Sequence, residues 1–174
     1  GRAMRGGTAG GRPKSGRGVS RRATVVAGVP LCRDGRKVQG RLVERNGRHF
    51  YRIVNHDAMP PFFMSLVSDS DHWLFASSNG ALTAGRRDPD RALFPYYTDD
   101  RIHDSQDQTG AKTLLRVTRG GKTFLWEPFS PRYDGLYRIE RDLFKSTVGN
   151  ELLFEETNAD LGLVFSYSWT SSER

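Results

Sequence analysis

The sequence predicts an all-β protein, built as an antiparallel β-sandwich, and three observations support this prediction. Short runs rich in β-branched and aromatic residues recur every 8–15 residues, and turn residues separate them. The dipeptide Asn46-Gly47 lies between two such runs, and Asn-Gly supplies the positive φ angles of a tight hairpin turn. No stretch has a convincing amphipathic helix pattern. Strands joined by turns at this spacing are typical of two-layered antiparallel folds.

Each strand is predicted from its pattern and its flanking turns. Pro60-Pro61 forbid a helix and precede a new strand, and Arg119-Gly120-Gly121 mark a second hairpin. Residues 136–147 alternate apolar and polar side chains; a helix over part of this stretch is the alternative, but the aromatic content favours a strand. We expect strands at residues 41–45, 48–54, 62–67, 72–77, 81–84, 112–118, 122–126, 136–147, 151–157 and 161–169.

Charge divides the 174-residue chain in two. Residues 1–48 hold 13 Lys and Arg against 2 acids, whereas residues 49–174 hold 14 against 18, which together give the net charge of +7. We therefore expect residues 1–40 to be a disordered, Arg- and Gly-rich tail or transition, with one strand possible at Thr24–Val26. The β-sandwich domain is expected at residues 41–174. Because the last strand runs almost into the end of the chain with no closing element, we expect this domain to be truncated from a larger enzyme.

The basic tail raises the question of nucleic-acid binding. Residues 1–22 carry 7 basic residues and 7 glycines without an acid, a composition that can neutralise phosphates. They lack the aromatic residues on which bases stack. Nucleic acid is therefore disfavoured as a partner, and a solvated tail, or sequence foreign to the domain, is favoured.

Cofactors, metals and membranes are not indicated. The single cysteine, Cys32, cannot form an intrachain disulfide, and neither it nor the four histidines show zinc-ligand spacing. No apolar run is long enough to span a bilayer. A cytoplasmic location is predicted; export is the alternative, because Arg21-Arg22 before an apolar run resembles a twin-arginine signal, although no cleavage site follows.

The sequence contains no nucleophile elbow, phosphate-binding loop or dinucleotide fingerprint. Three carboxylate groups are candidates for chemistry. Asp69-Ser70-Asp71 has metal-binding spacing but sits in a predicted turn, and Asp99-Asp100 precede His103 and Asp104 in a polar loop. Glu155-Glu156 lie in a predicted strand, where one side chain is expected to point outward.

Aromatic and polar residues gather in the middle of the sequence and suggest sugar binding, since aromatic faces pack on sugar rings while charged groups bind hydroxyls. The competing interpretation is that the aromatic side chains fill the space between two sheets. The proline-broken stretch at residues 92–97 lies between two polar loops and is least like plain core. The set comprises Trp73, Phe94, Tyr96, Tyr97, Trp126 and Trp169, with Arg86, Asp99 and Asp100 nearby.

Residues 61–100, PFFMSLVSDSDHWLFASSNGALTAGRRDPDRALFPYYTDD, resemble the opening of the N-terminal β-sandwich, or supersandwich, of carbohydrate phosphorylases of the cellobiose and chitobiose type. KTFLWEPFSP and the stretch at residues 137–169 are similar to later segments of that domain, so the resemblance covers roughly residues 50–169. It implies a sandwich that packs on an (α/α)₆ barrel, shapes the substrate entrance and contributes to a homodimer. The catalytic groups of such enzymes lie in or over the barrel, so no catalytic residue is assigned here.

The predicted function is therefore that of a non-catalytic sandwich from a carbohydrate phosphorylase or glycoside hydrolase. Its predicted partners are the barrel domain and, through the parent enzyme, an oligosaccharide. A stand-alone carbohydrate-binding module is the alternative, and a nucleic-acid-binding arm is a third hypothesis. The residues expected to contact substrate are Trp73, Arg86, Arg87, Tyr96, Tyr97, Asp99 and Asp100.

Overall fold

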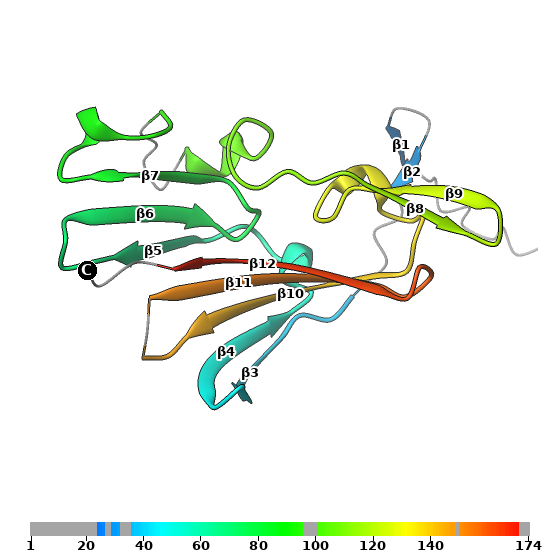
Figure 1. Cartoon of the computed structure of the whole chain (residues 1–174), viewed down its shortest axis with the longest axis horizontal. Coiled ribbons are helices and arrows are strands. Elements are labelled where there is room, and N and C mark those ends of the chain that lie inside the picture. The colour runs from blue at the N-terminus through cyan, green and yellow to red at the C-terminus, as the bar shows by residue number, and fades with distance from the viewer. Residues whose placement is uncertain (1–23, 27–28, 32–35, 96–100, 149, 171–174) are drawn as a thin grey trace, which may run out of the picture.

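The computed structural model describes residues 24–26, 29–31, 36–95, 101–148 and 150–170, and in these residues the fold is all-β with antiparallel sheets, as predicted (Figure 1). Its helices are four 3₁₀ turns, η1 to η4, of three or four residues each. None of the helices in this part of the chain has the length and apolarity that crossing a bilayer requires. The strands are β1 (Thr24–Val26), β2 (Val29–Leu31), β3 (Gln39–Arg45), β4 (Arg48–Val54), β5 (Phe63–Val67), β6 (His72–Ser77), β7 (Leu82–Arg86), β8 (Leu115–Arg119), β9 (Lys122–Trp126), β10 (Ile139–Ser146), β11 (Glu151–Asn158) and β12 (Leu163–Thr170).

Two sheets make up the sandwich. The larger has the order β12-β11-β10-β4-β3, and the smaller has the order β5-β6-β7. One hydrophobic cluster joins them, with Met64 and Leu66 from the small sheet and Leu152 and Phe154 from the large one. Burial alternates along β5 and β11 as expected for strands with one face toward a shared core. Separate hairpins, β1-β2 and β8-β9, complete the described strands.

The predicted hairpins are confirmed in position and cause. Asn46 and Gly47 have φ angles of 53° and 71° between β3 and β4, which is the backbone that a type I′ turn requires. Gly120 and Gly121 have φ angles of 54° and 74° between β8 and β9. Residues 136–147 form a strand rather than the alternative helix, although it begins only at Ile139.

The strand predicted at residues 41–45 begins earlier than expected. Strand β3 already begins at Gln39, and the Arg36 side chain donates to the Asp57 carboxylate at 2.6 Å. The short β1-β2 hairpin also falls within the stretch that was expected to be tail or transition, where it agrees with the strand considered at Thr24–Val26. Residues 1–23, to which most of the predicted tail belongs, lie outside the described residues.

The two faces of the large sheet differ in how they are covered. One face meets the small sheet, whereas the other carries Phe50 and Phe144, which are 1% and 4% exposed. Arginines of β3 and β4 cover these two rings: the guanidinium groups lie 5.1–5.7 Å from the ring centres. The same arginines form cross-strand ion pairs, namely Arg45 with Glu155, Arg48 with Glu151 and Arg52 with Asp142. A layer of paired charges therefore takes the place of a second sheet on this side.

Candidate functional site

A buried charge cluster lies at one end of the interface between the sheets, and Arg141 is its centre. The Arg141 side chain is 5% exposed. Its Nε donates to Glu156 at 2.7 Å, Nη1 to Asp57 at 2.7 Å and Nη2 to Asp134 at 2.8 Å. The register of β10 on β11 places Arg141 directly opposite Glu156, so both side chains point to the same inner face.

Glu156 is fully buried and has a complete set of donors. Besides Arg141, its carboxylate accepts from the Trp126 indole N–H at 2.7 Å and from the Phe129 backbone N–H at 2.5 Å. Burial opposes the charge on Arg141, but Glu156, Asp134 and Asp57 outweigh it and raise the pKa of Arg141 above its ordinary value. Arg141 therefore keeps its charge, and the carboxylates around it compensate that charge inside the fold.

Asp57 is shared between two arginines. Burial tends to raise its pKa, but the charges and hydrogen bonds of Arg141 and Arg36 prevail, so the pKa of Asp57 lies below its usual value. Only one carboxylate oxygen is used in this way. The other, Oδ1, is buried and has no hydrogen-bond partner.

His56 lies next to this cluster and is 3% exposed. It begins the 3₁₀ helix η1 (His56–Ala58), which follows Asn55 in left-handed conformation with φ 54°. Its ring packs edge-on against Phe154 at 5.9 Å between centres, and neither ring nitrogen has a hydrogen-bond partner of good geometry. Burial lowers the pKa of His56 to about 4; Asp57 opposes this, Arg141 and Arg36 reinforce it, and a backbone contact with Ser78 opposes it least. His56 is thus a neutral, unpaired imidazole at neutral pH.

A change of stability with pH follows from His56. Its pKa is lower in the folded chain than the ordinary value of 6.5, so protonation favours the unfolded chain. We expect the His56 contribution to be intact above pH 6.5 and lost as the pH falls toward 4, at a cost of about 3 kcal/mol. Urea denaturation between pH 7 and 4 measures it, with His56→Gln as the variant that cannot titrate. Equal slopes for the parent chain and the variant would contradict the assignment.

These groups line a cavity of about 600 Å³, called here the His56 cavity. This volume falls within the range of about 300–1,000 Å³ that small-molecule sites occupy. Tyr167, whose hydroxyl pKa is raised by burial, stacks on Phe154 at 5.0 Å between ring centres and forms part of the wall. The lining combines aromatic, charged and amide side chains: Phe129, Phe154, Tyr167, Arg36, Asp57, Asp134, Arg141, Asn79 and Gln106, with His56.

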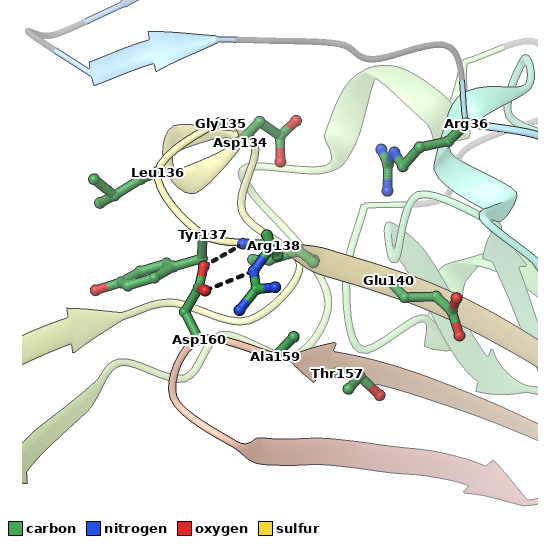
Figure 2. A pocket seen from close by; sticks show the side chains of 11 residues that line it. Arg36, Asp134, Gly135, Leu136, Tyr137, Arg138, Glu140, Thr157, Ala159 and Asp160 are labelled. Atoms are coloured by element: carbon green, nitrogen blue, oxygen red, sulfur yellow. Dashed lines mark hydrogen bonds and ion pairs between the residues drawn. The ribbon is translucent and has the colours of Figure 1, made fainter.

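A second cavity, of about 600 Å³ as well, adjoins the first and is called here the Arg138 cavity. The two cavities share Arg36 and Asp134 in their walls. Figure 2 shows the Arg138 cavity, with the loop at residues 134–138 on one side and Arg36 and Glu140 on the other. Asp160 accepts from the backbone N–H and from Nε of Arg138, both at 2.7 Å.

The residues predicted to contact substrate lie apart from both cavities where the structure describes them. Trp73 stacks on Phe75 at 5.2 Å between ring centres, on the face of β6 turned away from the core. Arg86 pairs with His72 across β6 and β7, so its side chain belongs to the opposite face from Trp73. Arg87 follows with φ 65° and forms an ion pair with Asp71 at 3.3 Å. Tyr96, Tyr97, Asp99 and Asp100 lie outside the described residues.

The carboxylates that the sequence suggested for chemistry at residues 69–71 and 99–104 do not line either cavity where the structure describes them. Asp69 and Asp71 lie in the turn between β5 and β6, as predicted, and Ser68 Oγ accepts from backbone N–H groups of that turn. His103 contacts Ser77 Oγ at 2.7 Å, and Asp104 is exposed. Among the described residues, no group of three or more His, Cys, Asp or Glu side chains is placed to hold a metal ion.

Sequence reasoning missed Arg141, Asp57 and His56 as members of a site. One signal was present: Glu156 continues the inward-facing series of Leu152 and Phe154, so the alternation of β11 places a carboxylate at a core position. A buried carboxylate requires a buried donor, and the facing strand offers Arg141. Asp57 and Asp134 come from loops, and no periodic pattern reveals them.

A scan of this chain against protein-family models gives no match, and a search of the curated proteins gives none either. The resemblance to carbohydrate phosphorylases therefore stays a prediction from the sequence.

Proposed function

We propose that this chain is the non-catalytic β-sandwich of a carbohydrate phosphorylase or glycoside hydrolase, where it binds part of an oligosaccharide and shapes its access to an (α/α)₆ barrel. The observation that carries the proposal is the His56 cavity, in which aromatic faces lie beside buried polar atoms without partners. The resemblance of residues 61–100 to such sandwiches supports the class of enzyme. The same resemblance implies that the parent enzyme is a homodimer.

The chemistry of the cavity suits a sugar. A pyranose ring offers an apolar C–H face that can pack on the partly exposed rings of Phe129 and Tyr167, and its hydroxyls both donate and accept. Asp57 Oδ1 and the His56 ring nitrogens are buried and unpaired, so a sugar hydroxyl gains them as partners only where the cavity wall moves to admit it.

The charge balance favours a neutral ligand over a phosphate. The cations of the wall, Arg36 and Arg141, are already paired with Asp57 and Asp134 at 2.6–2.8 Å. His56 adds no charge at neutral pH, since its pKa is about 4. An anion would therefore meet no uncompensated positive charge among these groups, and an uncharged polyhydroxyl compound loses nothing by this.

Binding and turnover of disaccharides test the proposal. We expect the full chain to bind cellobiose or N,N′-diacetylchitobiose saturably, by calorimetry or NMR titration, and not to bind inorganic phosphate. Ala58 is exposed and lines the cavity, so Ala58→Trp fills the space without disturbing the core and should lower the affinity at least tenfold. Val148→Trp, at a side chain 91% exposed beyond the end of β10, is the matched control and should bind normally.

Two results would contradict the proposal. Equal sugar affinity of the Ala58→Trp and Val148→Trp variants would mean that the sugar does not bind in this cavity. If the chain binds neither disaccharide, the proposed function is wrong. Release of sugar phosphate or free sugar by the chain alone, above background, would contradict its non-catalytic role.

A stand-alone carbohydrate-binding module is the second candidate. It is favoured by the stack of Trp73 on Phe75 at 5.2 Å between ring centres, because aromatic rings on the face of β6 turned away from the core can receive a sugar ring. It predicts micromolar or tighter binding without a barrel domain, whereas a sandwich that only completes a larger site should bind more weakly. Trp73→Ala tests the aromatic face of β6, and a loss of binding there would move the site from the cavity to that face.

A further inference from the structure

The two cavities meet at a pair of residues. Arg36 and Asp134 belong to the walls of both, and both are anchored: Arg36 to Asp57, and Asp134 to Arg141. The Arg36 side chain is 25% exposed and that of Asp134 is 11% exposed. Arg36 and Asp134 are thus held in place where the two cavities meet, and a ligand that extends from one cavity into the other would touch both side chains.

The Arg138 cavity has an aromatic wall that the fold holds in place. The Tyr137 hydroxyl donates to the Leu125 carbonyl at 2.8 Å, and the Tyr137 ring stacks on Tyr133 at 6.1 Å between centres. Leu136, 51% exposed, extends the apolar wall next to Tyr137. An apolar surface held rigid in this way can receive a ring at little cost in conformational entropy.

Polar groups that keep contact with water also line this cavity, and Arg138 and Asp160 lie beside Tyr137. Arg138 is 78% exposed and Asp160 36% exposed in their ion pair, and the Glu140 side chain is 50% exposed (Figure 2). Such groups can bind hydroxyls without the penalty of burying a charge. The acids Asp134, Glu140 and Asp160 outnumber the cations Arg36 and Arg138, which disfavours a nucleic acid or another polyanion.

We infer that the two cavities form one extended site for a neutral oligosaccharide of at least two linked sugars, with one unit in the His56 cavity and the next in the Arg138 cavity. The inference rests on the proposed function and deepens it by specifying the length of the ligand. Each cavity has an aromatic wall and hydroxyl-binding groups, and the two share Arg36 and Asp134, so two linked sugar units could make the same kinds of contact, one in each cavity. A single sugar would occupy only one of the two cavities.

The test is a ladder of ligand lengths. The full chain is titrated by NMR with cello-oligosaccharides and chito-oligosaccharides of one to four units. Affinity should rise at least tenfold from one unit to the longer chains. Ala159 is exposed and lines the Arg138 cavity, so Ala159→Trp fills this cavity alone. That variant should bind a single unit as the parent chain does and lose the gain with length, whereas Val148→Trp should keep it.

The outcomes separate the extended site from the proposed function. Binding that depends on Ala58 but is the same for one unit and four would overturn the extended site and leave the function standing. A gain with length that survives Ala159→Trp would also overturn it. If no member of either series binds, the function fails and the extended site fails with it.

Discussion

Replacing Arg141 with methionine is expected to destabilise the protein by about 3–5 kcal/mol, because it removes one partner of a buried ion cluster. Methionine has a similar length, so the packing loss is small and the electrostatic loss dominates. Glu156 is fully buried, and Arg141 is the cation that pairs with it in the described residues. Without Arg141 it would keep only the Trp126 and Phe129 donors. Asp57 would keep Arg36 alone. Urea denaturation at pH 7 measures the change in the free energy of unfolding.

Arg132→Met is the matched control for this prediction. The Arg132 side chain is 70% exposed and lies 3.9 Å from Glu127, so its removal should cost no more than about 1 kcal/mol. The double variant Arg141→Met with Glu156→Gln should recover part of the loss, since residue 156, the most deeply buried of the three acids, then carries no uncompensated charge. If Arg141→Met and Arg132→Met unfold at the same urea concentration, the cluster does not stabilise the fold as described.

Replacing Phe154 with alanine is expected to cost about 3–5 kcal/mol, because the ring joins the two sheets. Phe154 is 1% exposed and belongs to the shared hydrophobic cluster. Its ring contacts His56, Phe129 and Tyr167 at 5.0–6.2 Å between centres. Removal would leave a void beside the His56 cavity, which the surrounding backbone cannot close.

Leu153→Ala provides the comparison for Phe154→Ala. Leu153 is the preceding residue of β11, points to the other face of the sheet and is only partly buried. Its replacement should cost less than half as much, as judged from urea midpoints and an unchanged m-value. Equal losses at the two positions would mean that the inner face of β11 is not the main core.

Local sequence signals predicted the strands well, because their causes are local. Asn46-Gly47 requires a turn, Pro60-Pro61 exclude a helix, and the alternation of residues 151–157 matches a strand with one buried face. The contact that holds Arg36, ahead of the strand predicted at residues 41–45, is distant in sequence: Arg36 donates to Asp57, which no local pattern can show. Local patterns likewise do not show which strands pair with one another in the large sheet.

The site was less predictable than the fold, and the reason is geometric. Trp73 was predicted from the aromatic and polar set and Arg86 and Arg87 from the resemblance, but which face of a strand each side chain occupies depends on register, which places Trp73 and Arg86 on opposite faces. The His56 cavity gathers residues from η1, η4, β10, β11 and β12 and from loops at residues 36, 59–61, 78–79, 106, 129 and 134. Of the residues in and around this site, only Glu156 carries a local signal: it is a carboxylate at an inward-facing position of β11 after Leu152 and Phe154, which indicates a buried cation nearby.

The large sheet places the first long hairpin beside the last strands of the chain, with β4 paired to β10. Arg52 and Asp142, which are hydrogen-bonded across this pair, are 90 residues apart in sequence. Such contacts form only after a long loop has closed, which slows folding compared with a protein of local contacts. During synthesis the β3-β4 hairpin must therefore wait, with one edge open to other chains, until β10 has left the ribosome.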